Sequence, residues 1–316
     1  MSTDTTVRAV SQDELGGPEV LHLIDLPRPE PRTNEILVRV RAASLNPTDW
    51  KHRRKGGFLG QPPFVLGWDL SGVVEAVGVG VARFSVGDEV IGMLSYPFGH
   101  GAHAEYVAAP ARWFARKPAS LDHVHAAALP LVSLTAWQAL IENADLQAGQ
   151  RVLIHAAAGG VGHIAVQIAK ARGAYVIGTA SEPKHDYLRG IGVDEPIDYR
   201  TTDFAEAVSD VDVVLDTIGR DYSTRSLRVL RPGGIVVSIL PTGSNDFYEA
   251  AEQANLRAVR MLVDTSHAHL DAIAELAEQG RIAATIAQTF SLEDAAQAHR
   301  IGEENRTVGK LVFVVD

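Results

Sequence analysis

A short glycine-rich segment, AAGGVG at residues 157–162, constrains the fold of this chain more than any other feature. The residues before it, RVLIHA at 151–156, form an apolar run that is typical of a buried parallel strand. After it, apolar residues recur with the spacing of one helix face, at Val161, Ile164, Ala165, Ile168 and Ala169. A strand, a tight glycine turn and a helix are the context that a dinucleotide-binding fingerprint requires. We therefore predict that a dinucleotide binds at this turn.

The glycines of the turn have a physical reason. A side chain there would keep an anion away from the N–H groups at the start of the helix, where the helix dipole is positive. Ala157 takes the place of the first glycine in the usual G-x-G-x-x-G pattern. A glycine-rich turn without a ligand is the alternative interpretation. The predicted pyrophosphate contacts are Ala158, Gly159, Gly160, Val161 and Gly162.

The chain around this turn alternates strands and helices. Strands are expected at 151–156, 175–180, 212–216, 234–239 and 259–263, and helices at about 161–172, 184–190, 222–230 and 268–279. This alternation predicts an α/β fold with a doubly wound parallel sheet. Residues 7 to about 120 are instead β-rich, with period-two alternation and frequent Gly and Pro turns, which indicates a barrel-like or sandwich domain. The last strand, at 309–315, is expected to pair back with that domain.

The end of the second predicted strand bears on which dinucleotide binds. An NAD site usually has Asp or Glu there, which binds the ribose 2′-OH. This chain has GTAS at 178–181, and Lys184 follows three residues later. A hydroxyl and an ammonium suit a 2′-phosphate, which a carboxylate would repel. We therefore predict NADP(H), with Ala180, Ser181, Lys184 and Tyr199 as contacts; a solvated Lys184 at the start of a helix is the alternative.

Composition excludes several classes of function. The net charge of −10 argues against non-specific binding to nucleic acid or to an anionic membrane surface. No apolar run approaches the 18 or so residues that cross a bilayer. The chain has no cysteine, which excludes disulfides, thiolate catalysis and cysteine-bound zinc. The polar first residues, MSTDTT, differ from a signal peptide, so a cytoplasmic location is expected.

Several ordered motifs together resemble a known family. They are SLNPTD at 44–49, GWDLSGVVEAVG at 67–78, FSVGDEV at 84–90, LTAW at 134–137, AAAGGVG at 156–162, DVVLDTIG at 212–219 and GKLV at 309–312. The chain resembles the medium-chain dehydrogenase/reductase superfamily, and within it the zinc-free quinone oxidoreductase (zeta-crystallin-like) branch. The resemblance implies a discontinuous GroES-like substrate domain at 1–122 and 287–316, and a Rossmann NADP-binding domain at 123–286. It also implies an active site in the cleft between them, and often a homodimer through the edge of the Rossmann sheet, or a tetramer.

The resemblance also bears on metal binding. The zinc-dependent branch of this superfamily holds its catalytic metal with a Cys and a His. In this chain those positions fall at about Asn46 and at Trp68, and the four-cysteine structural lobe is missing. No metal is therefore expected. Many quinone oxidoreductases have a Tyr soon after the position of Asp49, whereas this chain has Trp50 and a basic run at 51–55 that we expect to be a solvated loop.

A nicotinamide site without metal suits hydride addition to a quinone or an activated C=C bond. The resulting charge spreads onto a conjugated oxygen, which a hydrogen-bond donor can support. We predict that Asn46 is this donor, or else that it only shapes the Asn-Pro turn. We predict Asp49 as the second residue of the catalytic site, where it is either a structural hydrogen-bond acceptor or a base. Trp50 is either core or one wall of the substrate pocket.

Further contacts are predicted where ligands bind open α/β sheets, at the carboxyl ends of later strands. These are Thr217, Ile218, Ile239, Leu240 and Pro241 for the cofactor, with Leu240 also facing the substrate. Thr135 is a cofactor contact or an ordinary helix threonine.

Three functions remain open from the sequence. The first is an NADPH-dependent reductase of quinones or α,β-unsaturated carbonyl compounds. The second is an enoyl reductase that acts on a specialised-metabolite or carrier-bound acyl intermediate. The third is an NADPH-binding redox-sensing protein without turnover. The expected partner is a small-molecule substrate, and neither nucleic acid nor membrane.

Overall fold

The computed structural model describes residues 6–240 and 246–315. Its contacts divide the chain into two compact units. Unit 1 comprises Met1–Leu131 and Asp264–Asp316, and unit 2 comprises Val132–Val263. The domain boundaries that we expect from the sequence, at 122/123 and 286/287, place helix α9 (His267–Glu278) in the Rossmann domain, whereas here it belongs to unit 1. Those boundaries stay a prediction.

Unit 2 contains a six-stranded sheet in which every pairing is parallel. Its strands are β9 (Arg151–Ile154), β10 (Tyr175–Ala180), β11 (Glu195–Asp198), β12 (Val211–Asp216), β13 (Leu230–Ser238) and β14 (Arg257–Arg260). Their order in the sheet is β11-β10-β9-β12-β13-β14. Numbered along the chain this is 3-2-1-4-5-6, the Rossmann order. The predicted doubly wound parallel sheet is confirmed, and β11 is the β segment that we expect to end near Asp198 and Tyr199.

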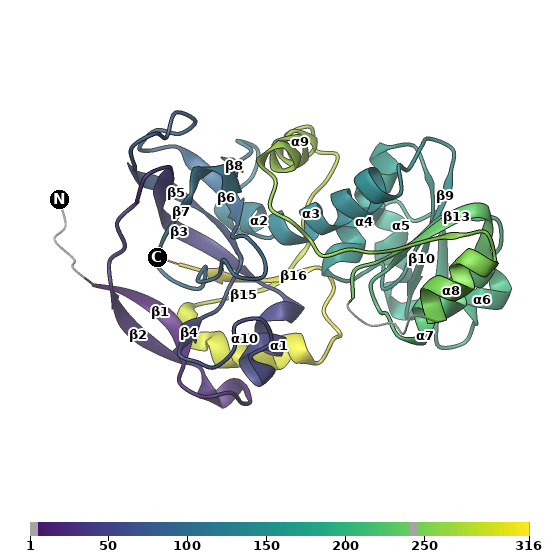
Figure 1. Cartoon of the computed structure of the whole chain (residues 1–316), viewed down its shortest axis with the longest axis horizontal. Coiled ribbons are helices and arrows are strands. Elements are labelled where there is room, and N and C mark those ends of the chain that lie inside the picture. Colours follow the sequence, from purple (N-terminus) through teal and green to yellow (C-terminus); the bar gives the residue numbers. More distant parts are fainter. Residues whose placement is uncertain (1–5, 241–245, 316) are drawn as a thin grey trace. The chain divides into compact units, whose positions relative to one another are not determined.

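Helices cover both sides of this sheet (Figure 1). They are α4 (Gly160–Ala171), α5 (His185–Gly190), α6 (Phe204–Ala207), α7 (Asp221–Ser226) and α8 (Asp246–Gln253), with α3 (Pro130–Trp137) before the first strand. In the central strand β9, the three residues after Arg151 (Val152, Leu153 and Ile154) are apolar and fully buried, as expected for a strand that is covered on both faces. Leu153 belongs to an apolar cluster that includes Phe204 and Phe247. Among the described residues, no helix combines the length and the apolarity needed to cross a bilayer.

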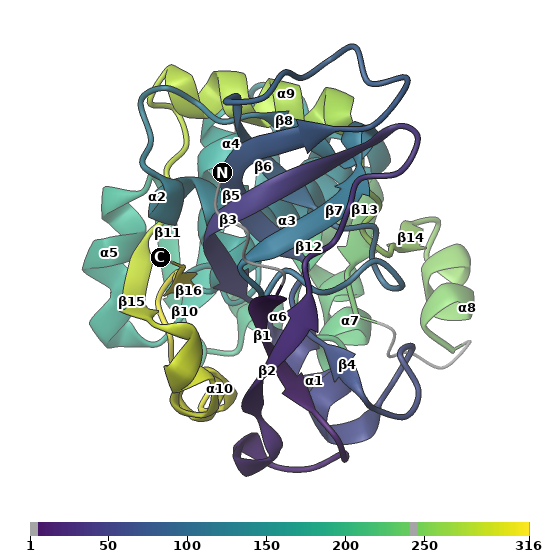
Figure 2. The ribbon, with the colours of Figure 1, turned by 90° about the vertical axis from the view of Figure 1, so that its left-hand side faces the viewer.

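Unit 1 contains two sheets (Figure 2). The larger has the order β15-β16-β3-β5-β6-β8, with β7 paired to β3, and the smaller has the order β2-β1-β4. The strands are β1 (Thr6–Gln12), β2 (His22–Pro27), β3 (Glu35–Leu45), β4 (Phe64–Val65), β5 (Asp69–Val77), β6 (Glu89–Met93), β7 (Tyr106–Pro110), β8 (Phe114–Arg116), β15 (Ile286–Phe290) and β16 (Lys310–Val314). The predicted β-rich fold of this part of the chain is confirmed.

The C-terminal strand returns to the N-terminal part of unit 1. β16 pairs antiparallel with β3, and Leu311 lies opposite Leu45. The expected return of the last strand is therefore confirmed. Lys310 thereby lies beside the end of β3, where helix α1 (Pro47–Lys55) begins. Helices α2 (His123–Ala127) and α10 (Ala295–Glu303) also belong to this unit.

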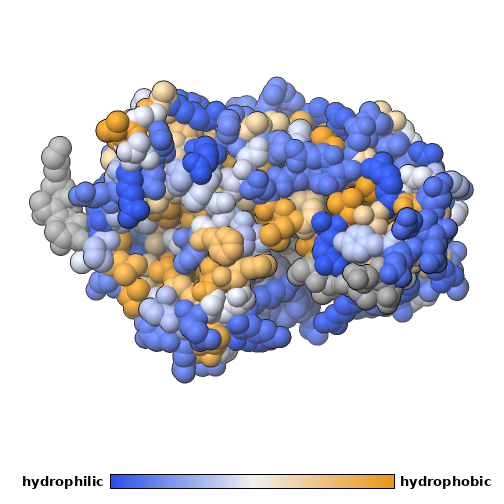
Figure 3. All heavy atoms as spheres, in the orientation of Figure 1, coloured by the Kyte–Doolittle hydropathy of each residue, from blue (hydrophilic) through white to orange (hydrophobic). Residues whose placement is uncertain are grey.

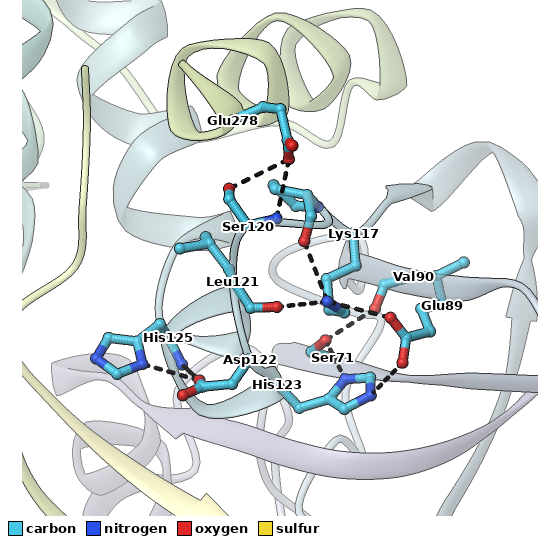
Figure 4. A network of polar contacts seen from close by, with 11 residues as sticks. Ser71, Glu89, Val90, Lys117, Ser120, Leu121, Asp122, His123, His125 and Glu278 are labelled. Atoms are coloured by element: carbon cyan, nitrogen blue, oxygen red, sulfur yellow. Dashed lines mark hydrogen bonds and ion pairs between the residues drawn. The ribbon is translucent and has the colours of Figure 1, made fainter. Parts of the chain in front are cut away.

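Polar contacts hold helix α9 against the segment that follows β8 (Figure 4). The backbone N–H and the hydroxyl of Ser120 both donate to the Glu278 carboxylate at the end of α9, at 3.2 Å. In the same segment, the ammonium of Lys117 donates to the Leu121 carbonyl and forms an ion pair with Glu89 at 3.1 Å. These contacts explain why α9 belongs to unit 1.

Candidate active site

The last glycine of the turn, Gly162, leaves no room for an added side chain. A Cβ on Gly162 would lie 2.3 Å from the Ala156 carbonyl oxygen and 2.7 Å from the Ala157 Cα. A Cβ on Gly178 of β10 would lie 2.9 Å from the Ala157 Cβ. The turn is therefore packed tightly against both the start of α4 and the neighbouring strand. Such close approach is the role of glycine in a dinucleotide-binding turn, so these residues fit a pyrophosphate.

The other predicted cofactor contacts of unit 2 gather at the same edge of the sheet. Parallel strands end at one edge, and the turn after β9, Thr217 after β12 and Ile239 after β13 all lie there. Asp216 organises this edge: its carboxylate accepts from the Ile218 N–H at 2.9 Å, and its carbonyl accepts from the Ile239 N–H at 3.1 Å. Leu240 follows directly and is half-buried. Pro241 lies outside the described residues, and Thr135 is buried in α3.

The end of β10 carries the predicted ribose contacts and a cation that sequence reasoning missed. Ala180 and Ser181 are buried, and Tyr199 is 48% exposed. Burial, together with repulsion by the Arg200 guanidinium, lowers the pKa of Lys184. Two cations near each other favour an anion between them. The available signal for Arg200 is its position directly after Tyr199.

In unit 1, four side chains form what we call the buried polar cluster: Asn46, Asp49, Asp69 and Lys310, all at most 3% exposed. The Asn46 Nδ2 donates to Asp69 Oδ2 at 2.8 Å, and the Asn46 Oδ1 accepts from the Lys310 ammonium. Because an ammonium only donates, the amide oxygen must face Lys310 and the amide nitrogen must face Asp69. One hydrogen of the Asn46 amide nitrogen remains for another acceptor.

Asp49 is a backbone acceptor at the start of α1. Its carboxylate accepts from the N–H of Asn46 at 2.6 Å and from the N–H of Gly67 at 3.0 Å. Burial raises its pKa to about 7. These two hydrogen bonds support the first alternative, in which Asp49 is a structural acceptor. Its role as a base stays a prediction.

Asp69 and Lys310 complete the charge balance of the cluster. Asp69 accepts from the Ser44 hydroxyl at 2.7 Å and from the Leu131 N–H at 2.8 Å, and burial raises its pKa. Lys310 donates to the Leu45 carbonyl at 2.8 Å and lies 3.9 Å from Asp69, while burial lowers its pKa. Sequence reasoning missed both residues as members of the site. The motifs that contain them were the only available signal.

Trp50 packs on helix α10. Its ring meets His299 edge-on at a centroid distance of 6.5 Å, and a Cβ on Gly302 would lie 2.7 Å from the indole. Of the two alternatives for Trp50, packing is the one with a visible contact. The role in a substrate pocket stays a prediction.

The basic run at 51–55 was expected to be a solvated loop, and this prediction was wrong. The run is the second half of helix α1, and Arg53 is fully buried. Its guanidinium forms an ion pair with Glu303 at 2.6 Å and donates to the Gly16 carbonyl at 3.1 Å. A buried guanidinium needs such partners to compensate for its lost hydration, and Gly16 and Glu303 are distant from Arg53 in the sequence.

Within residues 6–240 and 246–315, no group of three or more His, Cys, Asp or Glu side chains is placed to hold a metal ion. The expectation of a metal-free site stays a prediction.

Comparisons with known proteins agree with this architecture. Residues 32–119 match the alcohol dehydrogenase GroES-like domain, and residues 191–313 match a family described as zinc-binding dehydrogenase. A 2-haloacrylate reductase from Burkholderia sp is 34% identical, over 95% of this chain and 96% of its own length. The solved quinone oxidoreductase from Coxiella burnetii has a TM-score of 0.93 at 38% identity, covering 98% of this chain and all of that one. The Escherichia coli quinone oxidoreductase complexed with NADPH has a TM-score of 0.89 at 32% identity, covering 97% and 99%.

A GroES-like unit joined to a Rossmann unit defines an oxidoreductase that uses a nicotinamide cofactor. The chain belongs to the medium-chain dehydrogenase/reductase superfamily and, within it, to the zinc-free quinone oxidoreductase branch.

Proposed function

We propose that this protein is an NADPH-dependent reductase that transfers hydride to a quinone or an α,β-unsaturated carbonyl compound without zinc. The observation that carries the proposal is the pairing of the glycine turn, tightly packed at Gly162, with two cations, Lys184 and Arg200, near the end of β10, where Ala180 and Ser181 carry no carboxylate. NADPH supplies a hydride when it is bound. The E. coli relative with NADPH supports the choice of cofactor.

Different residues of unit 2 bind different parts of the cofactor. N–H groups of residues 158–162 bind the pyrophosphate at the start of α4. The Ser181 hydroxyl, Lys184 and Arg200 bind the 2′-phosphate, with the Tyr199 phenol beside it. Thr135 and the segments after β12 and β13 bind the nicotinamide end, through Thr217, Ile218, Ile239, Leu240 and Pro241.

In unit 1, Asn46 supports the charge that develops on the substrate oxygen. Its amide is held at both ends by Asp69 and Lys310, so the remaining N–H has a fixed direction before the substrate arrives. Asp49 fixes the backbone of Asn46 through the carboxylate that accepts its N–H. Trp50 and Leu240 are proposed to line the substrate pocket.

A cofactor and acceptor panel tests this proposal. NADPH and NADH affinities are measured by quenching of protein fluorescence, and NADPH oxidation is followed with 1,4-naphthoquinone and 2-cyclohexenone. We expect NADPH to bind about tenfold more tightly than NADH, since the 2′-phosphate gains charged hydrogen bonds. We also expect both acceptors to oxidise it. Tight NADPH binding without turnover of any acceptor would instead support the redox-sensing protein.

The enoyl reductase remains the second candidate. The Burkholderia relative is named for the reduction of a haloacrylate, which has a C=C bond conjugated to a carboxylate. Hydride addition to an enoyl thioester uses the same donor to oxygen, so the present site serves both reactions. A kcat/KM for crotonyl thioester above that for every quinone and enone in the panel would favour this candidate.

We infer a homodimer through the Rossmann sheet edge. Among residues 6–240 and 246–315, β14 is an edge strand that pairs with β13, and an edge strand can pair with a strand of a second copy. Sedimentation equilibrium tests this directly, with twice the chain mass of 33.9 kDa as the expected result. A cytoplasmic location remains a prediction that the acidic, cysteine-free composition supports.

A further inference from the structure

The glycine turn follows an alanine with an unusual backbone conformation. Ala156 has a φ of +47°, in the left-handed region that residues with a Cβ rarely adopt. Its carbonyl accepts from the Gly159 N–H at 2.8 Å, and this carbonyl oxygen is also the atom that a Cβ on Gly162 would meet. Ala156 thereby directs the chain from β9 into the turn. Other contacts must hold it in this conformation, because alanine by itself disfavours it.

Two threonine hydroxyls bind the peptide bond that precedes Ala156. The Ala156 N–H donates to the Thr179 hydroxyl oxygen at 3.1 Å, and the Thr217 hydroxyl donates to the His155 carbonyl at 2.7 Å. Thr179 belongs to β10 and Thr217 follows β12, and these two strands lie on either side of β9 in the sheet. The N–H and the C=O of one peptide bond are therefore bound from opposite sides. We call these two hydrogen bonds the threonine clamp.

The Thr179 side of the clamp lies beneath the surface of unit 2. Thr179 is 1% exposed, and its hydroxyl oxygen lies 3.4 Å from Nδ1 of His155. Nε2 of the same ring lies 2.9 Å from the hydroxyl of Ser226 on α7, and His155 and Ser226 are both fully buried. Hydrophilic side chains predominate on the face of unit 2 seen in Figure 3, whereas these three side chains form a chain of polar contacts below the surface. Because a buried N–H without an acceptor is unfavourable, the Ala156 N–H depends on Thr179.

The Thr217 side of the clamp is fixed by Asp216. The buried Asp216 carboxylate accepts from the Gly219 N–H at 2.8 Å and from the Ser223 hydroxyl. These hydrogen bonds hold the segment after β12, and with it Thr217 beside the His155 carbonyl. We place Thr217 at the nicotinamide end of the cofactor. The clamp therefore joins the segment at that end to the turn at the pyrophosphate end.

We propose that Thr179 is a positioning residue for the cofactor, and that the threonine clamp keeps Ala156 left-handed so that the N–H groups of the glycine turn face the pyrophosphate before the nucleotide binds. The inference rests on the proposed function and adds a residue that acts through the turn. Without the clamp, part of the free protein would hold Ala156 in an ordinary conformation. The apparent affinity then falls with the fraction of molecules whose turn is competent, because binding must restore the others.

Thr179→Val tests the clamp, because it removes the hydroxyl and keeps the shape of the side chain. NADPH and NADH affinities of the full chain are measured by quenching of protein fluorescence. Both should fall about five- to tenfold, the size of one buried hydrogen bond, since the two nucleotides share the pyrophosphate. Thr179→Ser keeps the hydroxyl and should bind both nucleotides within about twofold of the wild type. Thr224→Val makes the same change at an exposed threonine of α7 and should bind like the wild type.

Ala156→Gly separates positioning from a general loss of structure. Glycine adopts the left-handed conformation without a steric penalty, so it needs the clamp less. Adding Thr179→Val to Ala156→Gly should therefore weaken either nucleotide by no more than about twofold relative to Ala156→Gly alone. The kcat for NADPH oxidation by 1,4-naphthoquinone should change less than about twofold in Thr179→Val, because bound nucleotide restores the turn and the loss appears in the KM for NADPH.

Unchanged affinities in Thr179→Val overturn the proposal. So does an equal loss with and without Ala156→Gly, because Thr179 would then support the fold of unit 2 rather than the conformation of Ala156. Urea denaturation shows whether each variant is folded. If Thr179→Val does not fold, Thr217→Val removes the other half of the clamp from a half-buried side chain, and the same comparison with and without Ala156→Gly decides the question.

The two levels of proposal fail differently. If the wild type binds and oxidises NADPH and Thr179→Val binds it equally well, the clamp proposal fails and the reductase stands. If the wild type binds neither nucleotide, the proposed function fails and the clamp has no cofactor to position.

Discussion

The glycine turn of unit 2 and the buried polar cluster of unit 1 prepare a site in opposite ways. The turn depends on the absence of a side chain, because a Cβ on Gly162 would lie 2.3 Å from the carbonyl oxygen of Ala156. The cluster depends on charged side chains that bind one another. Lys310 donates to Asn46, although the two residues are 264 positions apart in the chain. The first is encoded locally and is damaged by added atoms. The second is encoded by the fold and is damaged by removing a charge.

This difference predicts where each unit is fragile. In unit 1, loss of one charged partner leaves the others buried without compensation, so stability should suffer first. In unit 2, small changes at the cofactor edge should alter nucleotide affinity while the apolar sheet keeps its fold. The four predictions that follow are ordered by expected size.

Lys310→Met should cause the largest loss. It removes the cation from Asn46 and Asp69 and should lower the free energy of unfolding by about 3–5 kcal/mol. Urea denaturation measures this. The matched control is Lys170→Met, which breaks an exposed pair with Asp194 and should cost no more than about 1 kcal/mol. Equal losses in the two variants would show that the cluster does not depend on its cation.

Asp49 should make stability depend on pH. Its pKa of about 7 in the folded chain exceeds the ordinary value of 3.8, so the folded state holds a proton that the unfolded state releases between these values. The stabilisation is complete below about pH 4 and is lost as the pH rises through 7. Relative to Asp49→Asn, the wild type should lose about 2–4 kcal/mol over this window.

Unfolding free energies of wild type and Asp49→Asn at several pH values provide the measurement. The constant cost of the lost carboxylate oxygen cancels when the two pH slopes are compared. Asp13→Asn, at a carboxylate that is 79% exposed, is the control and should follow the wild type. Parallel curves for Asp49→Asn and wild type would contradict a proton held at Asp49.

Gly162→Ala should weaken NADPH binding about 10- to 100-fold, because the new Cβ must displace the Ala156 carbonyl. Titration by nucleotide fluorescence measures the affinity. Gly190→Ala is the matched control, since a Cβ there would meet no atom within 4 Å. An affinity for NADPH that survives in Gly162→Ala would place the pyrophosphate elsewhere.

Lys184→Ala should have the smallest effect and the most selective one. It should reduce NADPH affinity about tenfold through the 2′-phosphate and leave NADH affinity unchanged. The exposed Arg189, which pairs with Asp186 on the following helix, provides the control substitution Arg189→Ala. Equal losses for both nucleotides would mean that Lys184 acts on the structure of the turn rather than on the phosphate.

The same contrast explains how much the sequence alone could predict. The parallel sheet, its strands near 151–156 and 175–180 and the glycine turn follow from local patterns, and the structure has them. Helix α8 was not expected from the sequence. The return of β16 to unit 1 was predicted from its apolar pattern and from the family resemblance, and the structure has it.

The partners inside unit 1 could not be predicted in this way. No local pattern shows that Lys310 meets Asn46, or that Arg53 in a basic run is buried against Glu303. These pairings depend on which helix and which strand pack together. Arg200 is a milder case, because it adjoins Tyr199, yet only the fold brings it near Lys184.

The central claim is that NADPH bound on unit 2 passes hydride to a conjugated acceptor. Single-turnover stopped flow with C4-deuterated NADPH and 2-cyclohexenone tests it most directly, with mass analysis of the product. We predict that the nucleotide is oxidised, that the rate falls on deuteration, and that one deuterium appears on the β-carbon of the saturated ketone. Bound NADPH that no enone, quinone or enoyl thioester oxidises would contradict the claim.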